Sequence, residues 1–195
     1  MELADKSHWV FDLDGTLTLP VHDFVLIRQE LGIDPAADIL ETIAAQSSAR
    51  RCTMLEQLDR LERHYAALAQ PAEGALALLQ QLSAKGCNLG ILTRNTKSLA
   101  ILSLEAIGAR HFFAEDDILG RDEISPKPAP DGINFLLNQW DADRTTAVMV
   151  GDFHFYLLSG RAAGVTTVHV DSRDRHWPED TDVRANSLLE LSFYL

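Results

Sequence analysis

The sequence predicts an α/β fold in which helices cover both faces of a parallel sheet, with a small all-helical insertion after the first strand. From Glu73 onward, short apolar runs alternate with segments of helical spacing, which is typical of parallel sheets buried on both faces. Between about Leu19 and Gln70 no strand signal occurs, and apolar residues recur every three or four positions, as in amphipathic helices.

The apolar runs place the expected strands at residues 9–13, 88–93, 146–151 and 166–170. Helical patterns are expected over residues 73–86, 97–108 and 130–140, and in a segment that runs through Ala163. Near the end of the chain, residues 187–191 form a short apolar stretch that we expect to be a packing helix.

The insertion contains three sets of apolar residues at helical spacing. They are Phe24, Ile27 and Leu31; Ile39, Leu40 and Ile43; and Leu55, Leu58, Leu61, Tyr65 and Leu68. Asp34-Pro35 is a helix-start signal ahead of the second set. We therefore expect a core domain formed by residues 1–18 and 71–195 and a helical domain formed by residues 19–70.

Composition limits the possible partners of the chain. Its 195 residues are 46% hydrophobic and 24% charged, as in one ordinary globular domain with a modest insertion. The 29 acidic and 17 basic residues give a formal charge of −12, which argues against nonspecific binding to nucleic acid or to an anionic membrane. The oligomeric state is left open by the sequence.

The cysteines and the first residues favour a cytoplasmic protein. Cys52 and Cys87 are far apart and have no metal-ligand spacing, which suits a reducing compartment. Residues 1–6 lack a basic start followed by an apolar stretch. No run approaches the roughly 18 apolar residues of a membrane span.

Two carboxylates, Asp12 and Asp14, lie two residues apart where the first apolar run meets Gly15. In a strand they would project to the same side. Clustered carboxylates repel each other, and Mg²⁺ is a usual means of keeping both ionised. A strand that simply ends in an Asp-Gly turn is the alternative.

Three later stretches carry further polar groups. Thr93, Arg94 and Asn95 follow the second strand, and each can donate a hydrogen bond to a phosphoryl oxygen. Lys127 lies between two prolines, which restrict its backbone. Asp152 follows Gly151 at the end of another strand. Ligand sites of open α/β sheets lie beyond the carboxyl ends of the strands, where we expect Asp12, Thr93 and Asp152.

In this order the four motifs resemble those of the haloacid dehalogenase superfamily of phosphohydrolases, over nearly the whole chain. The segments at residues 71–76, 91–95, 127–130 and 160–164 are most similar to its phosphoglycolate-phosphatase-like branch with a small helical cap. The resemblance implies a Rossmann-like core, a cap at residues 19–70, and a Mg²⁺-dependent phosphatase that acts on a small phosphorylated metabolite.

The resemblance also implies a role for each motif residue. Asp12 would be the nucleophile that forms an aspartyl-phosphate, and Asp14 the general acid and base. The dehalogenases of the superfamily lack an acid at the position of Asp14, so the resemblance disfavours dehalogenation. Mg²⁺ would be held by the carboxylates of Asp12 and Asp152 and by the backbone carbonyl of Asp14. Thr93, Arg94, Asn95 and Lys127 would bind the substrate phosphate, Thr93 and Lys127 also serving catalysis.

Some of these roles have alternatives. Asn95 could instead cap the following helix, and Arg94 could be a solvated side chain. Arg28, Arg50 and Arg51 lie in the expected cap, from which they could reach a substrate carboxylate or remain surface charges. His22 and His64 are equally ambiguous and are not assigned a catalytic role.

The main departure from the family pattern is Tyr156, where relatives usually carry a second aspartate that supports the metal site. A phenol supplies no ionised oxygen at neutral pH, so weaker Mg²⁺ binding is expected. Two alternatives to the phosphatase are a phosphosugar mutase of the same superfamily and a regulatory or binding protein with weakened catalysis. A P-loop nucleotidase is excluded because its glycine-lysine motif does not occur.

Overall fold

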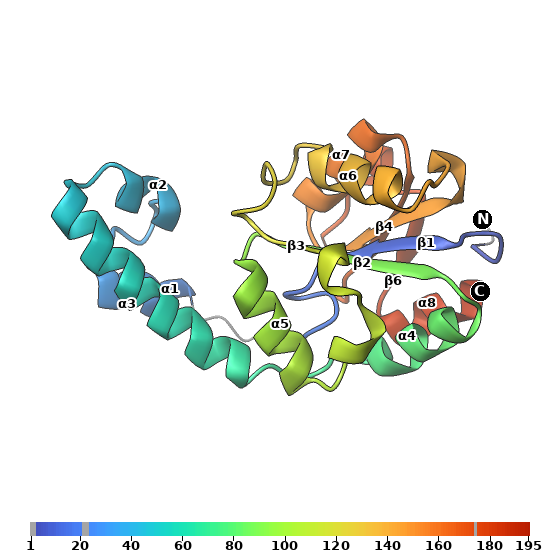
Figure 1. The fold of residues 1–195 in the computed structure, drawn as a ribbon, viewed down its shortest axis with the longest axis horizontal. Coiled ribbons are helices and arrows are strands. Elements are labelled where there is room, and N and C mark those ends of the chain that lie inside the picture. Colours follow the sequence, from blue (N-terminus) through green and yellow to red (C-terminus); the bar gives the residue numbers. More distant parts are fainter. Residues whose placement is uncertain (1–2, 21–23, 174) are drawn as a thin grey trace.

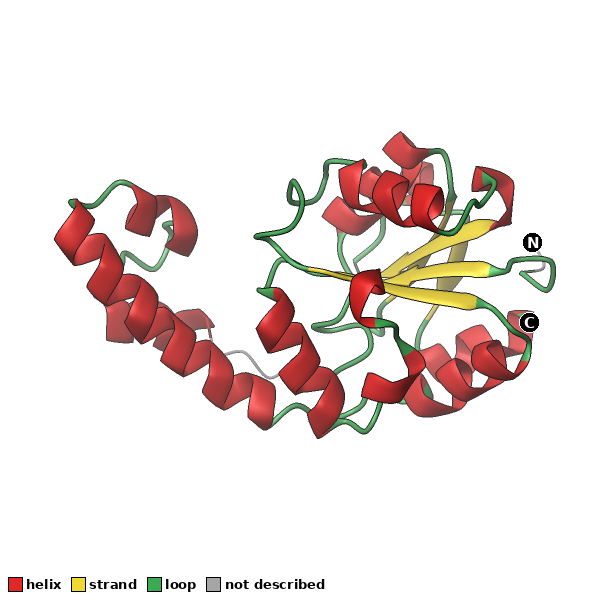
Figure 2. Ribbon diagram, viewed as in Figure 1, coloured by secondary structure: helices red, strands yellow, loops and turns green. Residues whose placement is uncertain are grey.

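A six-stranded sheet forms the centre of the computed structural model, which describes residues 3–20, 24–173 and 175–195. All neighbouring strands are parallel, in the order β3-β2-β1-β4-β5-β6. Figure 2 draws the strands in yellow and the helices around them in red. The strands are β1 (His8–Phe11), β2 (Asn88–Leu92), β3 (Ile118–Leu119), β4 (Ala147–Gly151), β5 (Thr166–Val170) and β6 (Val183–Ala185). This is the Rossmann order, in which the chain changes direction across the sheet at β1, and it confirms the predicted fold class.

Helices cover both faces of the sheet because its strands are apolar on both sides. Trp9 and Phe11 of β1 pack in one cluster with α4 (Ala75–Ala84), α5 (Lys97–Ala106) and α8 (Leu188–Leu191). Val10, which points the other way, packs in a second cluster with α6 (Asp131–Gln139) and α7 (His154–Ala163). Figure 1 shows these two helical layers on opposite sides of the sheet.

Three helices between β1 and β2 form a helical insertion beside the sheet domain (Figure 1). They are α1 (Phe24–Leu31), α2 (Ile39–Ala44) and α3 (Ser48–Ala67), and no strand occurs among the described residues of this segment. The helices share a separate apolar cluster that includes Ile27, Ile43 and Leu58. At the base of the insertion, α3 lies against α5, and the backbone N–H of Leu19 donates to the carbonyl of Gln70 at 2.9 Å.

Several predicted boundaries differ from the structure. β1 ends at Phe11, two residues before the predicted end, and β3 and β6 were not predicted. Asp34 does not start a helix: its carboxylate accepts from the N–H of Ala36 at 2.8 Å and forms a local turn. Asp38 caps α2 instead, accepting from the N–H of Glu41.

In the described part of the chain, no helix is both long enough and apolar enough to cross a membrane. His22 lies outside the described residues.

Candidate active site

The carboxyl ends of β1, β2 and β4 meet at one edge of the sheet. β1 lies between the other two strands, with Phe11 in register with Ile91 and Val150. Asp12, Thr93 and Asp152 are each the first residue beyond these strand ends, and all three are buried. The structure thus brings together the three strand-end residues that the sequence indicated.

A tight turn at Gly15 brings the backbone after β1 close to Asp152. Gly15 has φ +87°, and a Cβ added there would lie 2.8 Å from Oδ2 of Asp152, so only glycine fits. Because β1 ends before Asp12, strand alternation does not place Asp14. The turn does, and it directs the Asp14 carboxylate to Asn95, whose Nδ2 donates to Oδ2 at 2.7 Å.

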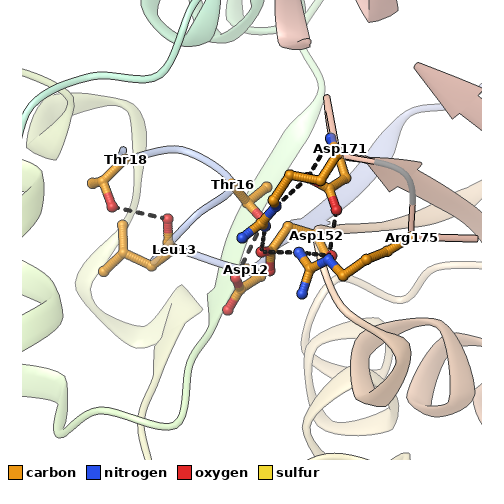
Figure 3. A network of polar contacts seen from close by, with 8 residues as sticks. Asp12, Leu13, Thr16, Thr18, Asp152, Asp171 and Arg175 are labelled. Atoms are coloured by element: carbon orange, nitrogen blue, oxygen red, sulfur yellow. Dashed lines mark hydrogen bonds and ion pairs between the residues drawn. The ribbon is translucent and has the colours of Figure 1, made fainter. Parts of the chain in front are cut away.

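Lys127 forms a buried ion pair with Asp12. Its Nζ lies 3.0 Å from Oδ1 of Asp12, and each side chain is 1% exposed. The same ammonium donates to the carbonyl of Leu92 and lies 3.6 Å from the centre of the Tyr156 ring, a cation–π contact. The hydroxyl of Thr16 donates to the other Asp12 oxygen at 3.2 Å (Figure 3).

Burial strongly affects the charges of this group. It raises the pKa of Asp12 to about 6, an effect that Lys127 opposes and that the neighbouring Asp152 and Asp14 reinforce. Burial likewise raises the pKa of Asp14 to about 6, with Lys127 opposing and Glu62 and Asp152 adding to the increase. The site therefore concentrates negative charge, and an added cation would stabilise the ionised carboxylates.

The loop after β2 supplies a hydroxyl and an amide, as expected. The Thr93 hydroxyl accepts from the backbone N–H of Asn95 at 3.1 Å. Asn95 does not cap α5, because Thr96 does so by accepting from the N–H of Leu99. The amide of Asn95 instead holds Asp14, so the capping alternative is wrong. Arg94 lies next to the ring of Phe155, at 6.0 Å from its centroid.

A cavity of about 330 Å³ lies between the sheet domain and the helical insertion. The sheet domain contributes Asp14, Thr93, Arg94, Asn95, Arg121 and Tyr156, and the insertion contributes Ile27, Arg28, Asp38, Ile39, Leu40, Leu58 and Glu62. Of the three insertion arginines considered above, Arg28 lines this cavity, whereas Arg50 and Arg51 are exposed and do not. His64 is also exposed and outside the cavity lining.

An ion pair in the cavity wall joins the insertion to the sheet domain. The guanidinium of Arg121, in the loop after β3, donates to both carboxylate oxygens of Glu62 on α3 at 3.2 and 3.1 Å. Their side chains are 18% and 9% exposed. The sequence does not indicate this pair, because its members are 59 residues apart and no local pattern marks either of them.

Asp152 has two arginine partners that the sequence does not indicate either; Figure 3 shows one of them, Arg175. Its Oδ2 accepts from Arg173 at 2.9 Å and from Arg175 at 3.1 Å. Asp171 accepts from both arginines as well. Burial would raise the pKa of Asp171, but these hydrogen bonds outweigh it and lower the pKa below its usual value. The sequence signal that could have indicated these contacts is the position of both arginines just after β5, the strand that pairs with β4.

The donors near Asp12 suit a hard divalent cation. The carboxylates of Asp12 and Asp152 and the carbonyl of Asp14 are all oxygen donors, which Mg²⁺ prefers. Among the described residues, no group of three or more His, Cys, Asp or Glu side chains is arranged to hold a metal. The expected ligand set contains only two such side chains, and its third ligand is a backbone carbonyl.

Comparison with known proteins identifies the family. The family model for haloacid dehalogenase-like hydrolases matches residues 27–170, so the chain belongs to this family of hydrolases. A haloacid dehalogenase-like hydrolase domain-containing protein of Arabidopsis thaliana is 30% identical, over 89% of this chain and 74% of its own length. The phosphoglycolate phosphatase of Rhodospirillum rubrum is 29% identical, over 82% and 77%.

The fold has close structural neighbours in the same family. A haloacid dehalogenase-like hydrolase from Streptococcus pneumoniae superimposes with a TM-score of 0.74 at 23% identity, covering 98% of this chain and 99% of that one. Because the identity is low, this likeness bears on the fold alone. It agrees with the parallel sheet and flanking helices described above.

Proposed function

We propose that this protein is a Mg²⁺-dependent phosphatase that hydrolyses a small phosphorylated metabolite through an aspartyl-phosphate on Asp12. The observation that carries the proposal is the buried Asp12–Lys127 pair at the carboxyl edge of the sheet, next to Asp14 and Asp152. The phosphatase named among the relatives supports the same reaction class.

In the first step, a carboxylate oxygen of Asp12 attacks phosphorus, and the bond between phosphorus and the substrate oxygen breaks. Asp14 donates its proton to the leaving alcohol. In the second step, Asp14 takes a proton from water, whose oxygen attacks the aspartyl-phosphate and releases phosphate and Asp12. A pKa near 6 for Asp14 suits a group that both donates and accepts a proton near neutral pH.

The groups around the Asp12–Lys127 pair would bind the substrate. The Thr93 hydroxyl and the Asn95 amide would donate to phosphoryl oxygens, and Lys127 would neutralise their charge. Asp12, Asp152 and the Asp14 carbonyl would hold Mg²⁺, which when bound offsets charge that develops on the phosphoryl oxygens. Arg94 and Arg28, both in the cavity wall, are placed to contact the rest of the substrate.

Residues 19–70 would act as a cap domain over the site, and residues 1–18 and 71–195 as the core domain. The cavity between them measures about 330 Å³, which favours a small substrate. A cap that closes over the cavity would exclude water and supply specificity contacts. We further propose that the protein works in the cytoplasm.

Phosphate release from a panel of small phosphomonoesters, with and without Mg²⁺, tests the function. We expect release that depends on the metal for at least one member of the panel. A sugar phosphate that isomerises without net phosphate release would indicate the mutase instead. No turnover of any kind would favour the regulatory or binding protein.

Exchanging Tyr156 for Asp is expected to lower the Mg²⁺ concentration at half-maximal activity by about tenfold, because supporting carboxylates tune metal affinity by such factors. Tyr156→Phe is the matched control, since it keeps the ring against Lys127 and adds no carboxylate. A metal titration of the three proteins provides the measurement. Equal half-saturation in the wild type and Tyr156→Asp would show that the missing aspartate does not limit metal binding.

Arg121→Gln is expected to lower the free energy of unfolding by about 1–3 kcal/mol, because Glu62 would remain largely buried without its charged partner. Glu62→Gln in the same background should recover part of the loss. Urea denaturation of the wild type, both single variants and the double variant gives the coupling between the two side chains. A coupling energy of zero would mean that the pair does not hold the insertion to the sheet domain.

A further inference from the structure

Two guanidinium groups bridge two carboxylates beside the proposed metal site. Arg173 donates from Nη2 to Oδ2 of Asp152 at 2.9 Å and from Nε to Oδ1 of Asp171 at 2.7 Å. Arg175 donates from Nη2 to the same Asp152 oxygen at 3.1 Å and from Nε to Oδ2 of Asp171 at 2.7 Å. We call Asp171, Arg173 and Arg175 the arginine clamp; Figure 3 shows Asp171 and Arg175 of the clamp beside Asp152.

The clamp is anchored on its far side. Asp171 follows β5 directly, is buried, and binds one arginine with each oxygen. Arg175 also donates to the backbone carbonyl of Asp152 at 3.0 Å and lies 5.3 Å from the centre of the Phe153 ring. Charge-assisted hydrogen bonds of this kind are directional and strong, so the clamp fixes both the position and the charge environment of Asp152.

The clamp and a cation need the same carboxylate. Oδ2 of Asp152, which accepts from both arginines, is also the atom that a Cβ on Gly15 would approach to 2.8 Å. It therefore faces the loop that carries Asp12 and the Asp14 carbonyl. Two positive charges at this oxygen reduce the negative potential that attracts a divalent cation.

We propose that the arginine clamp competes with the divalent cation for the Asp152 carboxylate and thereby weakens metal binding. This inference rests on the proposed function, which places the cation at Asp152. This effect on metal binding is separate from the effect of having Tyr156 where relatives carry an aspartate. The clamp acts through the positive charges of the segment after β5. Arg173 is the more accessible member, with its side chain 51% exposed against 31% for Arg175.

Direct binding of Mn²⁺ to the 195-residue chain without substrate tests the proposal, with free Mn²⁺ measured by electron paramagnetic resonance. Arg173→Gln is expected to lower the dissociation constant by about three- to tenfold, because one positive charge beside the carboxylate is removed. Arg173→Lys, which keeps the charge and loses the planar fork, should stay closer to the wild type. Arg175→Gln is a second variant that should shift affinity in the same direction.

Arg63→Gln is the matched control. Arg63 is 50% exposed and pairs with Asp59 on α3, so its removal changes net charge equally without touching Asp152. Equal or weaker Mn²⁺ binding in both Arg173→Gln and Arg175→Gln, or the same gain in Arg63→Gln, would overturn the competition. Asp152→Asn separates the two proposals: if it binds Mn²⁺ as the wild type does, the cation does not bind at Asp152, and the metal site of the proposed function is also wrong.

Discussion

Asp12→Asn is expected to lower the rate of phosphate release by at least about a thousandfold, because an amide cannot form the aspartyl-phosphate. Asn has nearly the shape of Asp. Its carbonyl oxygen can still accept from Lys127, and its amide group can donate to the Thr16 hydroxyl, which in the wild type donates to the other Asp12 oxygen. The variant should therefore fold, and the loss should appear in the chemical step.

Steady-state phosphate release from a phosphomonoester that the wild type hydrolyses provides the measurement, with circular dichroism to verify the fold. Asp59→Asn is the control, since Asp59 is an exposed aspartate on α3 that pairs with Arg63. Retention of more than a few per cent of wild-type activity by folded Asp12→Asn protein would mean that another residue is the nucleophile.

Lys127→Met is expected to lower the free energy of unfolding by about 3–5 kcal/mol at pH 7, the usual cost of leaving one member of a buried ion pair without its partner. Asp12 and Lys127 are each 1% exposed, so water cannot replace the lost ammonium. The same variant should lose most of its phosphatase activity, because the phosphoryl charge would no longer be neutralised.

The loss of unfolding free energy in Lys127→Met should depend on pH. Asp12 already has a pKa of about 6 with Lys127 present, and Lys127 lowers that pKa, so the variant should have a higher one. A carboxyl group whose pKa is higher in the folded than in the unfolded protein lowers the free energy of unfolding fully when the pH is above the folded-state pKa. This cost disappears as the pH falls to the unfolded-state pKa. The difference from the wild type should thus be largest above pH 7 and shrink toward pH 4.

Urea denaturation of both proteins across this pH range tests the prediction. Lys85→Met is the control, because Lys85 donates to the carbonyl of Leu195 at the surface and its loss should have little effect at any pH. A deficit that stays constant between pH 4 and pH 8 would show that Asp12 does not titrate as described.

The sequence predicted the parts of the fold that have strong local patterns. β1, β2, β4 and β5 are apolar runs of four or five residues, and the helices of the insertion follow apolar residues at helical spacing. β3 and β6 contain only two and three residues, too few for a periodic signal, and their pairing with the sheet depends on tertiary structure.

The site was predictable to the extent that its residues end a strand or lie in a recognisable motif. Asp12, Thr93, Lys127 and Asp152 meet these conditions, and the structure brings them to one edge. Glu62 pairs with Arg121 across 59 residues, and Arg173 with Asp152 across 21. Such partners are set by how the insertion and the segment after β5 pack, which no local spacing encodes.

Trapping the intermediate tests the central claim most directly. The wild type is mixed with a phosphomonoester that it hydrolyses and with Mg²⁺, quenched in acid during turnover, digested, and searched by mass spectrometry for phosphorylated peptides. The proposed mechanism predicts one phosphoryl group on Asp12, which appears only with substrate and is absent from Asp12→Asn. Turnover with no phosphorylated peptide, or with the phosphoryl group on another residue, would contradict it.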